Sequence, residues 1–194
     1  MQYDIRWIRY DQKNLIIELS KDIYEKNSKV SYSPNLNQAA NPNEAMPHVL
    51  DLFLIPPAYL GSDQRKIIGV FDENNQLVMA TGVRCLLTNQ AWVLSWTLSK
   101  IKDFSFKKVW QQHVQFACEY FENIGYKEFW TVSPVSRESA YRSLMLPMRE
   151  KYWTFVEFTV PQHQRTDFSL YWSLMGNRSY PYDINIRRYI MKRD

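Results

Sequence analysis

The chain has 194 residues, 45% of them hydrophobic and 15% aromatic, and its 24 basic and 20 acidic side chains give a formal net charge of +4. This length and hydrophobic content predict one domain with a packed core and exclude a disordered chain. The charge excess is small and diluted over the whole length, so it gives little support to a polyanionic partner such as nucleic acid.

The first third of the chain alternates between periodic and irregular segments. Residues 3–10 alternate apolar and charged side chains, which predicts a short strand, and an apolar stripe in residues 12–26 predicts a helix. Residues 28–43 are rich in Ser, Asn and Pro and predict a loop. A second helix is expected from Asn43 onward, and Pro56-Pro57 must end it.

Three apolar runs then predict a meander of antiparallel strands. Residues 66–71 and 77–86 are separated by a turn that contains Asn74-Asn75, a pair that tolerates the left-handed backbone of tight turns. Residues 91–98 form the third strand. This strand carries few charges, so we expect both of its faces to be covered.

A long amphipathic helix is predicted after the meander. Ser105 can cap it, its apolar stripe runs from Phe106 to Ile124, and Gly125 is placed to end it. A strand at 128–133 follows after only two residues. This tight strand, helix, strand unit implies a parallel pair with a right-handed crossover.

The remaining elements are shorter. Residues 136–145 predict a short helix that stops near Pro147, and residues 152–160 alternate as a strand. Residues 184–191 predict the closing strand, reached through the segment 161–181. No internal repeat or linker divides the chain, so we expect one domain over residues 1–194.

This order of elements resembles the GNAT acyltransferases. The most specific stretch is 116–129, Phe-Ala-Cys-Glu-Tyr-Phe-Glu-Asn-Ile-Gly-Tyr-Lys-Glu-Phe, which is similar to the family's long helix that ends in Gly and an aromatic residue before a strand. The resemblance implies an α/β (α+β) fold with a mixed, mostly antiparallel sheet of about seven strands. Helices on both faces and a splayed parallel strand pair are also implied. The compact, aromatic-rich and Asn-rich chain also resembles GNAT-like proteins of bacteriophages.

The resemblance implies an acetyl-CoA site in the wedge between strands 91–98 and 128–133. Backbone amides at the start of the long helix would hold the pyrophosphate, because they are unpaired and lie at the positive end of the helix dipole. The residues expected to bind the cofactor are Leu98, Ser99, Lys100, Lys102 and Ser105. The segment 99–105 departs from the family's Arg/Gln-x-x-Gly-x-Gly/Ala pattern, since it contains no glycine and Ile101, Phe104 and Phe106 crowd the turn.

The catalytic residues of the family are also incompletely matched. Amine acylation needs a group that accepts the amine's proton and a group that protonates the departing thiolate. Strand 91–98 contains no acid or His, which leaves water relays, Glu128 or Glu157 as acceptors. Tyr141, on the short helix, is the candidate catalytic residue, and its alternative role is ordinary packing.

The sequence is therefore compatible with three functions. The first is an N-acyltransferase that moves an acetyl group from acetyl-CoA to an amine of a small molecule or protein. The second is a catalytically inactive GNAT-like fold that serves as a binding or structural protein, as a homo-oligomer or with virion proteins of a phage. The third and weakest is nucleic-acid binding through a basic cluster near the end of the chain: Arg178, Arg187, Arg188, Lys192 and Arg193.

Several other residues favour ordinary structural roles. Cys85 and Cys118 are expected as buried free thiols, and His113 as a partly buried polar residue of the long helix. No residues have metal-ligand spacing. No leader or membrane-length apolar run is evident, so a cytoplasmic protein is expected. A set of aromatic residues is expected to fill the core of the sheet: Trp92, Trp96, Trp130, Trp153 and Phe155.

Overall fold

The computed structural model describes residues 2–26, 63–86, 91–101, 105–160 and 183–192. Within these ranges the strands are β1 Asp4–Trp7, β2 Asp63–Phe71, β3 Leu77–Leu86, β4 Ala91–Ser99, β5 Glu128–Pro134, β6 Tyr152–Val160 and β7 Ile184–Met191. The α-helices are α1 Lys13–Lys26, α4 Ser105–Asn123 and α5 Glu138–Leu144, and the 3-10 turns are η1 Tyr10–Gln12, η4 Val135–Arg137 and η5 Leu146–Arg149.

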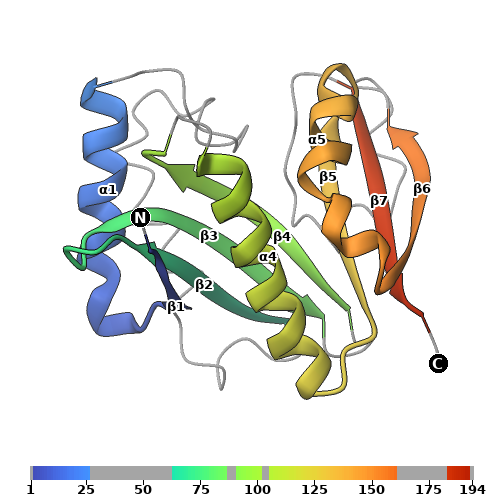
Figure 1. Ribbon diagram of the computed structural model, residues 1–194, viewed down its shortest axis with the longest axis horizontal. Coiled ribbons are helices and arrows are strands. Elements are labelled where there is room, and N and C mark those ends of the chain that lie inside the picture. The colour runs from blue at the N-terminus through green and yellow to red at the C-terminus, as the bar shows by residue number, and fades with distance from the viewer. Residues whose placement is uncertain (1, 27–62, 87–90, 102–104, 161–182, 193–194) are drawn as a thin grey trace.

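The described strands form one seven-stranded sheet in the order β1-β2-β3-β4-β5-β7-β6. Only the β4–β5 pair is parallel, and the other neighbours are antiparallel. Figure 1 shows α4 lying across the sheet and α5 beside it over the later strands. The predicted mixed sheet with one parallel pair is confirmed.

Helices cover both faces of the sheet because each buries one apolar stripe. On one face, α1 buries Ile16, Leu19 and Ile23 in a cluster that includes Ile67 and Leu98. On the other face, α4 buries its own stripe in a larger cluster with residues of the strands, α5 and η5. Of the described helices, none is both long and apolar enough to span a membrane.

Two turns have a left-handed backbone at residues for which the sequence predicted a turn or a helix end. Gly125 has a φ of 93°, and the amide of Tyr126 donates to the carbonyl of Phe121 at 2.8 Å, which closes the end of α4. In the β2–β3 turn Asn75 has a φ of 57°, and a carboxylate oxygen of Asp72 accepts from the amides of Asn74 and Gln76 at 2.9 Å each.

Some boundaries differ from the prediction. The strand expected over 3–10 ends at Trp7 and gives way to η1, and the helix expected over 136–145 is divided into η4 and α5. The α-helix expected to stop near Pro147 ends at Leu144, and Pro147 then occupies the first turn of η5, where a missing amide donor costs nothing. The helix expected from Asn43 and the loops at 28–43 and 161–181 lie outside the described residues.

The prediction that all five aromatic residues fill the core was wrong for two of them. Trp92 and Trp130 are buried, but Trp153 is 58% and Phe155 47% exposed. Both exposed residues lie on β6, the edge strand, on the face opposite to Tyr152, which is packed in the core. The side chain of Trp96 is not described. Cys85 and Cys118 are buried free thiols, as expected.

Candidate functional site

The parallel strands β4 and β5 pair over only three residues each. The pairs are Ala91 with Glu128, Trp92 with Phe129 and Val93 with Trp130, although the strands run on to Ser99 and Pro134. The β3–β4 register then shifts, from Val83 opposite Leu94 to Gly82 opposite Trp96, so Ser95 is an extra residue in β4. Such a bulge bends a strand and increases its twist. The strands therefore diverge beyond Val93 and Trp130 (Figure 1), as the resemblance implied.

Hydroxyl side chains line the diverging part of these strands on the face that α4 and α5 cover. Thr97 and Ser99 belong to β4, Thr131 and Ser133 belong to β5, and all four are at most 4% exposed. The hydroxyls of Thr97 and Thr81 lie 3.1 Å apart. The Oγ1 atom of Thr131 is buried and makes no hydrogen bond to any described residue. Because an unsatisfied buried hydroxyl costs about 1–3 kcal/mol, a ligand that hydrogen-bonds Thr131 would stabilise this region between the diverging strands, which we call the crevice.

Two contacts tie α4 to α5 across this crevice. The Nζ atom of Lys107 donates to the hydroxyl of Ser143 at 2.9 Å, and the Nε2 atom of Gln111 donates to the carbonyl of Ser143 at 3.4 Å. Lys107 and Gln111 lie one turn apart near the start of α4. The start of this helix is therefore held beside α5.

The structure places the expected cofactor-binding residues on both faces of the sheet. The side chain of Leu98 belongs to the α1 cluster, so only its main chain could meet a ligand in the crevice. The hydroxyl of Ser99 accepts from the amide of Ile101 at 3.0 Å. Lys100 forms an ion pair with Asp22 of α1. Ser105 is the first residue of α4, and Lys102 lies outside the described residues.

The candidate catalytic residues are also placed, with one exception. Tyr141 lies partly buried on α5, and the guanidinium carbon of Arg187 is 5.6 Å from the centre of its ring. Glu128 accepts from Nη2 and Nε of Arg188 at 2.6 and 2.8 Å and from the indole of Trp130 at 3.2 Å. Because its carboxylate is already held by Arg188 and Trp130, Glu128 is a poor candidate for the group that accepts the amine's proton. The side chain of Glu157 is not described.

His113 was expected to be partly buried but is completely buried on α4. Burial lowers the pKa of His113 to about 3, and the nearby carbonyls of Trp110 and Val109 oppose this shift only in part. The imidazole is therefore neutral at physiological pH. Its ring meets the edge of Trp110 at a centroid distance of 4.6 Å. Its place between two buried apolar residues of the helix stripe was the sequence signal for this burial.

A thiol nucleophile is not supported at this site. Cys118 lies under η5, where its sulfur is 3.6 Å from that of Met148. Burial raises the pKa of the Cys118 thiol to about 12, so almost no thiolate is present near neutral pH. The neighbouring hydroxyl of Tyr152 donates to Glu122.

Comparison with known proteins rests on structure, because no family model and no curated protein matches this sequence. The chain is similar to ribosomal-protein-S5-alanine acetyltransferase from Vibrio fischeri, with a TM-score of 0.63 and 11% identity over 98% of this chain and 93% of that chain. It is also similar to a probable acetyltransferase from Staphylococcus epidermidis, with a TM-score of 0.60 and 14% identity over 97% and 99% of the two chains.

A third similar structure is a GNAT superfamily phosphinothricin acetyltransferase from Sinorhizobium meliloti in complex with AcCoA. Its TM-score is 0.60 and its identity 9%, over 98% of this chain and 89% of that chain. These likenesses extend over nearly the whole of each chain, so the chain has the fold of the GNAT acetyltransferases.

Proposed function

We propose that this protein is an N-acyltransferase that transfers an acetyl group from acetyl-CoA to an amine. The observation that carries the proposal is the divergence of β4 from β5 after three residue pairs, where four hydroxyl side chains are buried between the strands and the helices. A thioester with an amide-bearing arm presents donors and acceptors that match such a lining. The similarity to acetyltransferase structures supports the same reading.

In the proposed reaction the lone pair of a neutral amine attacks the thioester carbonyl. A carbon–nitrogen bond forms, the carbon–sulfur bond breaks, the amine nitrogen loses a proton and the sulfur gains one. A main-chain amide near Leu98 would donate to the carbonyl oxygen as negative charge develops there. Tyr141 would protonate the leaving sulfur, and water would take the amine's proton because Arg188 and Trp130 hold Glu128.

The proposed pyrophosphate contacts come from the start of α4. The amides that follow Ser105 are the unpaired donors of the first helical turn. Lys100 and Lys102 would add positive charge beside them, and Lys100 would first have to leave Asp22.

Calorimetric titration with acetyl-CoA, combined with amide hydrogen exchange, tests the proposal. We expect binding at or below millimolar concentration. We also expect bound acetyl-CoA to slow exchange at residues 94–99 and 131–134, where the strands have separated, more than at the paired residues 91–93 and 128–130. Absence of heat at millimolar acetyl-CoA, or protection confined to other elements, would contradict the enzyme.

A matched pair of threonine variants sharpens this test. Thr131→Val removes a hydroxyl that makes no hydrogen bond to a described residue, so it should keep the fold while weakening acetyl-CoA binding about two- to tenfold. Thr159→Val removes an exposed hydroxyl on β6, which donates to Asn185 at 2.6 Å, and should leave the affinity unchanged. Equal effects of the two variants would argue against a ligand in the crevice.

A binding or structural protein without chemistry is the second candidate. Two observations favour it: β4 carries no acid or His, and Glu128 is already paired with Arg188. A component of a bacteriophage particle is one form of this candidate. It predicts a stable assembly, so sedimentation as a strict monomer with no co-purifying protein, together with acetyl-CoA binding, would eliminate it.

A further inference from the structure

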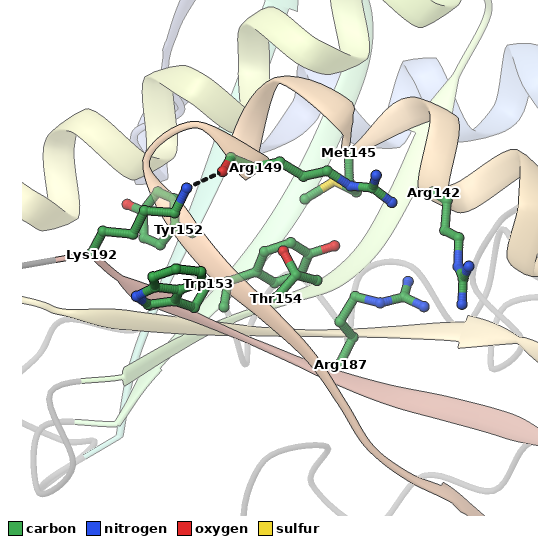
Figure 2. Close-up of a pocket in the computed structure, with 9 residues that line it drawn as sticks. Arg142, Met145, Arg149, Tyr152, Trp153, Thr154, Arg187 and Lys192 are labelled. Atoms are coloured by element: carbon green, nitrogen blue, oxygen red, sulfur yellow. Dashed lines mark hydrogen bonds between the residues drawn. The ribbon is translucent and has the colours of Figure 1, made fainter.

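A cavity of about 390 Å³ lies between the helical segment α5–η5 and the strands β6 and β7 (Figure 2). Four cationic side chains line it: Arg142 of α5, Arg149 of η5, Arg187 of β7 and Lys192, which follows β7. No Asp or Glu is among the described residues that line it. The described part of the cavity wall is therefore rich in cationic side chains.

The guanidinium groups come from opposite sides of this cavity. Figure 2 shows Arg142 and Arg149 extending from the helical segment toward Arg187, which rises from β7. Arg187 is 2% exposed, whereas Arg142 and Arg149 are exposed. Because a guanidinium stays protonated in proteins, Arg187 places a positive charge in the buried part of the cavity.

Lys192 is positioned by two contacts at the rim. Its Nζ atom donates to the carbonyl of Arg149 at 2.6 Å and lies 4.9 Å from the centre of the Trp153 ring. These contacts hold its charge at the entrance without cancelling it. Trp153 leaves more than half of its surface exposed beside this entrance.

The neutral residues that line the cavity contribute one hydroxyl group and some apolar surface. The Oγ1 atom of Thr154 is buried and makes no hydrogen bond to a described residue. The buried side chains of Met145 and Tyr189 provide apolar surface. A volume of this size is within the roughly 300–1,000 Å³ typical of small-molecule pockets, so it has room for more than an inorganic ion.

We propose that this cavity binds a small molecule that carries a phosphate group, held by Arg142, Arg149 and Arg187. A phosphomonoester carries about −1.5 to −2 charges near pH 7 and three strong acceptor oxygens. Three planar guanidinium groups, each able to donate two parallel hydrogen bonds, match that acceptor set better than the two oxygens of one carboxylate. Thr154 supplies a further donor. The site lies between α5–η5 and the strands β6 and β7. It borders the proposed acetyl-CoA site only at Arg187, whose guanidinium carbon is 5.6 Å from the centre of the Tyr141 ring.

Titration calorimetry at constant ionic strength tests this site with three probes: inorganic phosphate, ribose 5-phosphate and 5′-AMP. We expect binding of at least one probe, and a dissociation constant raised about tenfold or more in Arg142→Gln and in Arg149→Gln. Both side chains are exposed, so these variants should fold. Arg9→Gln is the matched control, because Arg9 is exposed, pairs with Asp11 at 3.1 Å and lies outside the cavity.

The three probes distinguish the source of the phosphate. Equal affinities would indicate that the phosphate group alone is recognised. Tighter binding of ribose 5-phosphate or 5′-AMP would show that the sugar or the nucleotide is recognised as well. Either result supports the site. Absence of binding by all three at millimolar concentration would overturn it. Affinity retained in the Arg142→Gln, Arg149→Gln double variant would also overturn it.

A final arm separates this site from the proposed enzyme activity. Acetyl-CoA itself carries a phosphate ester, so it is titrated into wild type and Arg149→Gln under the same conditions. We expect unchanged acetyl-CoA affinity in this variant with weakened binding of the small phosphates. Failure of the crevice and failure of the cationic cavity therefore give different results.

Discussion

At the scale of single residues, Lys100 is a proposed phosphate contact whose present partner the structure identifies. Lys100 now pairs with Asp22 on the opposite face of the sheet, and both side chains are partly exposed. If Lys100 contributes to acetyl-CoA binding, Asp22→Asn should tighten binding by releasing it, and Lys100→Met should weaken binding. A partly exposed pair is worth at most about 1 kcal/mol, so each change should be fivefold or less.

Calorimetry on these two variants and on Asp11→Asn measures the effect. Asp11 is also an acid in an exposed ion pair, but it pairs with Arg9 and lies in η1, before α1 begins, so its loss controls for net charge. Shifts of the same sign in Asp22→Asn and Lys100→Met would show that Lys100 acts only through the fold.

The residues of the candidate site could be predicted only where their role depends on local sequence. The start of the long helix was predicted to within one residue, since Ser105 was expected to cap the helix and is its first residue. The partners of the charged residues could not be found in this way. Lys100 meets Asp22, and Glu128 meets Arg188, which is 60 residues away. Such pairs depend on which strands become neighbours, and no periodicity within one segment carries that information.

At the scale of elements, the end of α4 depends on one backbone conformation. Gly125 has a φ of 93°, and a Cβ atom built there would meet nothing within 4 Å. Gly125→Ala should therefore destabilise the protein through backbone strain alone, by about 1–2 kcal/mol, and Gly125→Asn should cost less. Urea denaturation measures both free energies of unfolding. Lys127→Ala, at an exposed neighbour, is the control, and an equal loss in all three variants would contradict the argument.

Element boundaries followed the sequence where the period was clear. Strands β3 and β6 begin and end as predicted, because β-branched and alternating runs are bounded by turn residues. The order of strands was not predictable in the same way. β7 inserts between β5 and β6, which makes β6 the edge strand and exposes Trp153 and Phe155. The cationic cavity was missed for the same reason, since its arginines come from three separate elements.

At the scale of the whole molecule, the sheet consists of two parts joined by a short parallel seam. The strands β1 to β4 form one part, and β5, β7 and β6 form the other. Both proposed sites involve the second part. Thr131 of the crevice pairs across the sheet with Arg187 of the cationic cavity. The two proposed sites therefore share the β5–β7 strand pair, while Arg142 and Arg149 belong to the cavity alone.

The stability of the whole molecule should depend on pH through His113. Its pKa falls from 6.5 to about 3 on burial, so between these values the unfolded chain binds a proton that the folded chain does not. Stability is complete above pH 6.5 and falls by about 1.4 kcal/mol for each pH unit below it, until the folded pKa is reached. His113→Leu places an apolar side chain at this buried position and removes the group that the unfolded chain protonates.

Urea denaturation of wild type and His113→Leu from pH 7 to pH 4 isolates this effect. Carboxylates titrate in both proteins, so their contribution cancels in the difference between the two stability curves. We expect the variant to lose less stability than wild type as the pH falls from 6.5, because it has no imidazole to protonate on unfolding. Parallel curves over this range would mean that His113 remains protonatable in the folded protein, and that α4 does not exclude water from it.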